Sequence, residues 1–265
     1  AFWKEFGPAI KEGLLMGPER NEKLLELVIA DSSAKSDEMR SLSDYVDAMP
    51  EERKEIYYLC GNHIETLRRS PHLEAFKDKG IEVLLFTDPV DEIWLQQGLE
   101  FKGKSFVSAS RGEISLDGEE GSESKDEDDK SSGSAELGDL LLAIRTSLQD
   151  EVKEVRISKR LTSSAACLVT DAGDLSPQME QILRASGQEV PASKRILEVN
   201  PTHPVLEALD KLHKESASHP LIGTYAKLLF GQAVLAEGGQ ISDPSAFAQL
   251  VAELMVTAAG QELNA

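Results

Sequence analysis

The sequence predicts an α/β domain followed by a small α+β domain that ends in a helical hairpin. Two continuous apolar runs of strand length, Ile56 to Cys60 and Ile81 to Phe86, flank a helical pattern that breaks at Pro71. A strand, a helix and a strand without a hairpin signal indicate a parallel pair joined by a right-handed crossover. We expect a small three-layer αβα domain here, with Ser105 to Ala109 as an edge strand.

A stretch of different composition, from Asp117 to Lys130, follows the first domain. It consists of acids, lysines, glycines and serines and contains no apolar residue. Such a segment cannot form a core and is typical of a flexible linker. The chain is therefore expected to form two globular parts.

The sequence of the second part predicts a small mixed sheet covered by helices. Leu137 to Leu148 has the pattern of an amphipathic helix. Val152 to Ile157 alternates as a half-exposed strand does, Ala166 to Val169 is expected to pair with it, and Lys194 to Val199 is a third strand. Ser176, followed by proline, caps a further helix.

The chain ends in two predicted helices between His219 and about Thr257, separated by glycines before the N-cap Asp243. The first is apolar on nearly every side and carries Lys227 as its only charge. One hairpin cannot hide this much apolar surface. A membrane is disfavoured because each run is shorter than the ~20 apolar residues that a bilayer needs. Packing into the chain's own core and pairing with a second copy in a four-helix bundle both remain open.

The composition excludes several classes of partner. The chain has 28 Lys plus Arg against 47 Asp plus Glu, and its net charge of -19 argues against nucleic acid or anionic lipid. Cys60 and Cys167 lie in apolar runs, which indicates reduced core residues and a cytoplasmic protein. The chain has no initiator Met, signal peptide or transit segment, and we expect it to be a fragment of a longer protein.

Gly98 to Ser105 satisfies the spacing of a nucleotide-binding P-loop. That loop works by opening a helix, whereas a strand-like run follows here, and Glu100 would place a carboxylate where phosphate must sit. A glycine turn is favoured, and a nucleotide hydrolase that uses Lys104 and Ser105 is the rival hypothesis. The histidines and cysteines lack metal-ligand spacing, so no metal site is predicted. The sequence has no nucleophile motif and no indicated pair of buried carboxylates, so no catalytic or cofactor-binding residue is predicted either.

Two places suggest exposed apolar surface. Ile93, Trp94 and Leu95 are consecutive in the helix predicted after Pro89, so one helix face cannot bury all of them. The helix after Ser176 carries an apolar stripe flanked by polar residues, and on pattern alone this stripe is favoured as a core face over a binding surface. The stripe consists of Leu175, Met179, Ile182 and Leu183.

Short segments spread along the chain carry a family resemblance. They are Phe2-Trp3-Lys4-Glu5-Phe6-Gly7, Ser41-Leu42-Ser43-Asp44-Tyr45-Val46, Ile56-Tyr57-Tyr58, Ser70-Pro71-His72-Leu73-Glu74, Lys79-Gly80-Ile81-Glu82-Val83-Leu84, Glu100-Phe101-Lys102-Gly103-Lys104, Val155-Arg156, Arg160-Leu161, Gly187-Gln188-Glu189-Val190-Pro191 and Leu197-Glu198-Val199-Asn200-Pro201-Thr202-His203-Pro204. In their order, and over nearly the whole chain outside the acidic stretch, they resemble the bacterial HtpG-type members of the heat-shock protein 90 chaperones.

The resemblance implies a domain order. Residues 1–112 would be the carboxyl end of the family's middle domain, 113–135 an acidic flexible linker, 136–258 the C-terminal dimerisation domain and 259–265 a disordered tail. The terminal hairpin would form a four-helix bundle in a homodimer. The implied interface residues are Leu221, Tyr225, Leu228, Leu229, Phe247, Leu250 and Leu254.

The resemblance also implies function: the chain would bind non-native client proteins and help them to fold under stress. The implied client-binding residues are Glu92, Ile93, Trp94, Gln96, Leu175, Met179, Ile182 and Leu183. Which of Ile93 and Trp94 faces the client is left open, because the family's aromatic is displaced by one residue. The ATP site and its Mg²⁺ would lie in a domain before Ala1, so this chain is not expected to be an enzyme. Its last residues do not resemble the tail by which cytosolic eukaryotic relatives recruit tetratricopeptide co-chaperones, so such partners are not expected. A dimeric scaffold without client binding is the other alternative.

Overall fold

The computed structural model describes residues 2–17, 21–35, 38–112, 132–171, 173–189 and 193–262. The acidic stretch expected to be a linker lies outside these ranges. Contacts divide the chain into two compact units, Ala1–Lys125 with Thr170–Ser193, and Asp126–Val169 with Lys194–Ala265. This division groups the helix that follows Ser176 with the first unit, whereas the expected domain order places it in the second.

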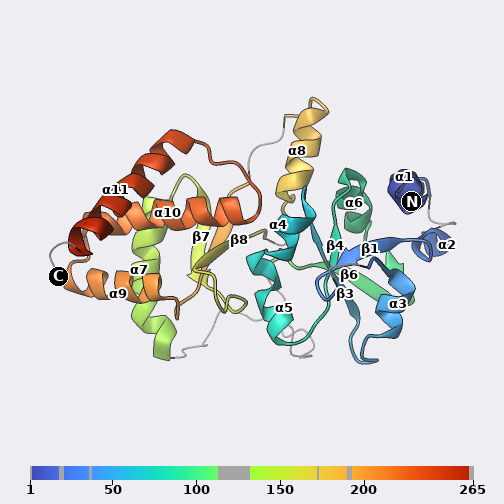
Figure 1. Ribbon diagram of the computed structural model, residues 1–265, viewed down its shortest axis with the longest axis horizontal. Helices are drawn as coiled ribbons and strands as arrows, with labels where there is room; N and C mark the ends of the chain where they lie inside the picture. Colours follow the sequence, from blue (N-terminus) through green and yellow to red (C-terminus); the bar gives the residue numbers. More distant parts are fainter. Residues whose placement is uncertain are drawn as a thin grey trace. The chain divides into compact units, whose positions relative to one another are not determined.

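The first unit contains a six-stranded mixed sheet with helices on both of its faces (Figure 1). Its strands, in the spatial order β2-β1-β4-β3-β6-β5, are β2 (Arg40–Ser41), β1 (Ile29–Ser32), β4 (Leu84–Phe86), β3 (Glu55–Cys60), β6 (Lys104–Ser108) and β5 (Glu100–Phe101). Its helices are α1 (Phe2–Glu12), α2 (Asn21–Leu25), α3 (Leu42–Asp47), α4 (Ile64–Arg68), α5 (Glu74–Asp78), α6 (Pro89–Trp94) and α8 (Pro177–Ala185), with 3₁₀ turns at Gly13–Leu15, Pro71–Leu73 and Leu95–Gln97.

The predicted αβα layering of this unit is confirmed by the alternation of buried residues along β3. Ile56 and Tyr58 pack with Trp94 of α6 on one face, whereas Tyr57 and Leu59 pack with Phe76 of α5 on the other. Strands β3 and β4 are parallel, as expected. The predicted edge strand was wrong, because β6 lies between β3 and β5 and pairs with both.

The second unit contains a three-stranded sheet in the order β7-β9-β8. The expected pairing of the first two strands was wrong, because β9 enters between them, parallel to β7 and antiparallel to β8. The elements of this unit are α7 (Ser132–Ser147), β7 (Val152–Ile157), β8 (Ala166–Val169), β9 (Arg195–Val199), α9 (Pro204–Glu215), α10 (Pro220–Ala236) and α11 (Pro244–Glu262). Helix α11 includes residues 259–262, which were expected to belong to the tail.

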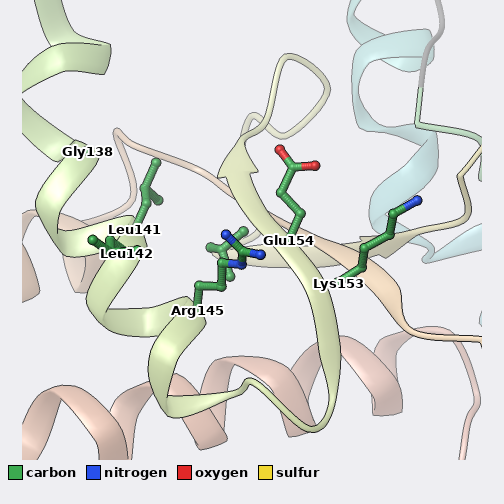
Figure 2. Close-up of a pocket in the computed structure, with 7 residues that line it drawn as sticks. Gly138, Leu141, Leu142, Arg145, Lys153 and Glu154 are labelled. Atoms are coloured by element: carbon green, nitrogen blue, oxygen red, sulfur yellow. The ribbon is translucent and has the colours of Figure 1, made fainter.

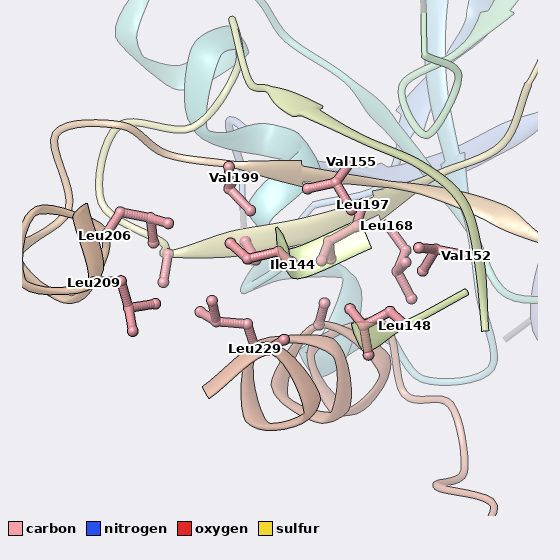
Figure 3. Packing of buried hydrophobic residues seen from close by; sticks show 14 of the residues in the cluster. Ile144, Leu148, Val152, Val155, Leu168, Leu197, Val199, Leu206, Leu209 and Leu229 are labelled. Carbon is pink, nitrogen blue, oxygen red and sulfur yellow. The ribbon is translucent and has the colours of Figure 1, made fainter. Parts of the chain in front are cut away.

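The core of the second unit lies between this sheet and the helices α7, α9 and α10 (Figure 3). Ile144 of α7, Leu206 of α9 and Leu197 of β9 are each fully buried in it. One face of α10 joins this core through residues three or four positions apart, as a helix that covers a sheet requires. These residues are Ile222, Ala226, Leu229 and Ala233.

Helices α10 and α11 form the predicted hairpin. Asp243 caps α11 by accepting a hydrogen bond from the Ala246 amide at 2.9 Å. Gly231 brings the two helices close together, because a Cβ atom at this position would lie 2.4 Å from Cε2 of Phe247. In the parts of the chain that the structure describes, no helix has the length and hydropathy to cross a membrane.

Candidate functional site

Helix α6 is held at its first turn by a buried lysine from α1. The Lys11 ammonium, in a residue only 3% exposed, lies 2.8 Å from a carboxylate oxygen of Asp88 and 2.8 Å from one of Asp91. Asp91 also accepts hydrogen bonds from the Asp88 amide and from Nε1 of Trp94. Burial raises the pKa of Asp91, and the donors Lys11 and Trp94 act in the opposite direction. These contacts fix α6 against α1.

Trp94, a predicted client-binding residue, is completely buried. Its ring packs edge-on against Phe86 and Phe106, with centroid distances of 5.7 and 5.3 Å. Ile93, by contrast, is partly exposed and Gln96 is exposed. Of the two consecutive residues left open by the sequence, Ile93 is therefore the one with accessible apolar surface.

Glu92, next in the chain to Asp91 on α6, is 7% exposed. Its carboxylate is bonded to the residue that caps α8. Its Oε2 atom accepts hydrogen bonds from Oγ of Ser176 at 2.7 Å and from Nε2 of Gln96 at 3.3 Å. The Cys60 thiol also donates to this carboxylate. Burial raises the pKa of Glu92, and these three donors counteract the rise. Burial also raises the pKa of the Cys60 thiol, and the neighbouring carboxylates add to that rise.

Helix α8, which carries the predicted apolar stripe, packs against α6. Its N-cap is Ser176, whose Oγ accepts a hydrogen bond from the Met179 amide at 3.1 Å. Met179 faces inward and is 9% exposed, whereas Leu175, Ile182 and Leu183 are partly exposed. The two predicted client-binding segments thus lie on adjacent helices of one unit. Ile182 and Leu183 of α8 remain accessible, as does Leu175 just before its N-cap.

The residues predicted for the dimer interface fall into two groups. Leu229 is 3% exposed and belongs to the core of the second unit. Tyr225 is partly exposed and packs against the same core. The others lie on α10 and α11: Leu221 is 39% exposed, and Leu228, Phe247, Leu250 and Leu254 are partly exposed. Nearby Leu235, Met255 and Val256 are 50, 67 and 74% exposed. The hairpin therefore presents an apolar surface that the described part of this chain does not cover.

The segment with P-loop spacing forms a β-hairpin. Strands β5 and β6 are antiparallel, and the turn residues Lys102 and Gly103 have φ angles of 50° and 70°. Positive φ at both central residues is the signature of a type I′ hairpin turn. Nζ of Lys104 donates to the carbonyl oxygens of Glu51 and Arg53 and is not directed at an open loop. A strand follows the motif where a nucleotide site requires a helix, so the chain forms the glycine turn that the sequence favoured.

A buried ionic cluster in the second unit was missed by the sequence analysis. Glu198 of β9 is 3% exposed and accepts hydrogen bonds from Arg156 at 2.8 Å, Arg160 at 2.9 Å and Ser158 at 3.0 Å. A lone acid inside the apolar strand at residues 195–199 is the signal that could have revealed it. The cluster ties β7 and the segment after it to β9.

An open pocket of about 510 Å³ lies between α7 and β7 (Figure 2). Leu141, Leu142 and Arg145 line it from the helix, and Lys153 and Glu154 from the strand. The lining contains no arrangement that indicates a nucleophile or a metal site. Among all the residues that the structure describes, no group of three or more His, Cys, Asp or Glu side chains could hold a metal ion.

Comparison with known proteins gives a consistent result. The family model described as "Hsp90 protein" matches residues 1–265. The chain is 45% identical over 254 residues to "Chaperone protein HtpG" of Mycolicibacterium paratuberculosis, 45% over 251 residues to that of Rhodococcus jostii, and 44% over 263 residues to that of Frankia casuarinae. These alignments cover 95, 95 and 97% of this chain and 39% of each relative's length. A family match along the whole chain, supported by these identities, shows that the chain belongs to the Hsp90 family.

Proposed function

We propose that this chain is the dimerising, client-binding portion of an HtpG-type molecular chaperone. The observation that carries the proposal is the contact between α6 and α8. Ile93 of α6 and Gln96 just after it are accessible, as are Ile182 and Leu183 of α8 and Leu175 just before its N-cap. Partly exposed leucine and isoleucine on a helix can contact many apolar sequences, as a chaperone requires. Contacts of this kind are individually weak and gain from being duplicated in a dimer.

The proposed homodimer rests on the uncovered apolar surface of the hairpin. The inner face of α10 is core, so removing the whole hairpin would unfold the second unit as well as remove the interface. Single charges on the outer side are a cleaner test. We expect Val256→Glu and Met255→Glu to halve the solution mass while the monomer stays folded. A mass unchanged by both substitutions would contradict the interface.

ATP binding is proposed for the longer protein and not for this chain. Support comes from the β-hairpin at Gly98–Ser105, which leaves the rival hydrolase without a phosphate-binding helix. Client binding is tested by titrating the chain into a reduced, unfolded lactalbumin probe and measuring fluorescence anisotropy. Ile182→Ser with Leu183→Ser should weaken binding. A chain that forms dimers but binds no unfolded probe would favour the scaffold alternative.

A further inference from the structure

Glu92 is among the residues that family resemblance implicates in client binding, yet its carboxylate has little access to solvent. The residue is 7% exposed, and its Oε2 atom is occupied by Ser176 of the neighbouring helix at 2.7 Å and by Gln96 at 3.3 Å. A client segment could reach this oxygen only by displacing α8. While α8 packs against α6, Glu92 therefore cannot contribute to client binding by direct contact through this oxygen.

Ser176 performs two tasks with one hydroxyl group. As the N-cap it accepts the Met179 amide hydrogen at 3.1 Å, and it donates its own proton to Glu92. A hydroxyl has one donor and two acceptor sites, so both bonds form together. The group that starts α8 is thus the same group that attaches α8 to α6.

Helix α6, which carries Glu92, is held in place by buried contacts. The adjacent Asp91 is completely buried and bonded to Lys11 and Trp94, so α6 cannot turn without breaking those contacts. The other groups that face the Glu92 carboxylate are Cys60 on β3 and Asp91 on its own helix. Glu92 therefore holds α8 from a fixed position.

We propose that Glu92 is a positioning residue, whose buried carboxylate seats α8 through Ser176 and so presents Ile182 and Leu183 to clients. This inference deepens the proposed function and rests on it for the client-binding step. It adds Ser176, which the sequence pattern indicated only as a helix cap, to the residues on which client binding depends.

The test reverses the donor and acceptor roles of the Ser176 and Glu92 side chains. Aspartate is also a good N-cap, so Ser176→Asp preserves the start of α8 but places a second carboxylate against Glu92. We expect this variant to bind the unfolded lactalbumin probe about 10- to 100-fold more weakly, as expected for the loss of a charge-assisted hydrogen bond. In the double variant with Glu92→Gln, the amide donates to the new carboxylate, and affinity should recover to within about threefold of the original.

Two control variants distinguish a change in the position of α8 from the effect of an added negative charge. Ser176→Thr keeps the hydroxyl and should bind as the unmodified chain does. Gln181→Glu adds the same negative charge to an exposed position of α8 and should also leave affinity unchanged. Amide hydrogen exchange over residues 177–185, measured without client, should show lost protection in Ser176→Asp and restored protection in the double variant.

The two readouts distinguish failure of this inference from failure of the proposed function. If Glu92→Gln alone abolishes probe binding while α8 keeps its protection, Glu92 contacts the client itself and the inference is overturned. If Ser176→Asp leaves α8 protected, the inference is also overturned. If no variant and not even the unmodified chain binds the probe, the proposed function fails, and the protection pattern of α8 still decides the positioning role.

Discussion

A close contact between the helices of the terminal hairpin yields a quantitative prediction. Gly231 of α10 lies beneath the ring of Phe247 in α11, and a Cβ atom there would approach ring carbons Cε2 and Cδ2 to 2.4 and 2.7 Å. Real Cβ atoms do not come this close to carbon, so Gly231→Ala must push the ring or the whole of α11 away. Gly223, on the same helix, is the matched control, because its nearest neighbour would be Oγ of Ser147 at an ordinary 3.5 Å.

The magnitude follows from two opposing effects. Replacing a helical glycine with alanine favours the helix by about 0.8–1 kcal/mol at either position. Overpacking costs about 1–3 kcal/mol, and only Gly231→Ala incurs it. Helix propensity cancels when the variants are compared, so Gly231→Ala should be less stable than Gly223→Ala by about 1–3 kcal/mol.

The assay is urea unfolding followed by circular dichroism at one protomer concentration, since unfolding of a dimer depends on concentration. Light scattering on the same samples reports the mass. Gly223→Ala should unfold at the same or a higher urea concentration than the unmodified chain. Gly231→Ala should unfold at a lower urea concentration than Gly223→Ala. Equal midpoints for the two variants would refute the packing of Phe247 on Gly231 and with it the described geometry of the hairpin.

Three further predictions concern buried charged residues and the β-hairpin of β5 and β6. Glu198→Ala should lower the free energy of unfolding by about 3–5 kcal/mol, because it removes the buried carboxylate that pairs with the buried Arg160 and the partly exposed Arg156. Glu92 has a raised pKa in the folded chain, so folding favours its protonated form. Relative to Glu92→Gln, the unmodified chain should therefore lose stability as pH rises from its ordinary pKa of 4.5 through the raised value, which parallel urea titrations at pH 4 to 7 would measure. Finally, ATP with Mg²⁺ should leave the melting temperature unchanged, because Lys104 is engaged by backbone carbonyls.

Each of these predictions has a clear contrary result. A loss below about 1 kcal/mol for Glu198→Ala would mean that the arginines find other partners or water. A stability difference between Glu92→Gln and the unmodified chain that does not change with pH would show that the Glu92 carboxyl titrates normally. A melting temperature that rises with ATP in the unmodified chain but not in Lys104→Ala would revive the nucleotide hypothesis.

Much of the fold could be predicted from the sequence because its signals are local. The parallel strands β3 and β4 follow from apolar runs separated by a helical pattern, and the hairpin follows from Asp243 and the glycines before it. Caps, glycine turns and apolar periodicity act within a few residues, so they can be recognised without knowing the tertiary structure. The family is likewise determined by the sequence alone.

Tertiary structure decided which residues each surface presents. The insertion of β9 between β7 and β8 has no local signature, because strand order depends on contacts between distant segments. The consecutive residues Ile93 and Trp94 look equally apolar in sequence, and only the packing of Trp94 against Phe86 and Phe106 shows which of them is buried. The bond between Glu92 and Ser176 joins residues 84 positions apart. Burial and long-range hydrogen bonds arise from the assembled chain, so they appear only once the sheet and helices are in place.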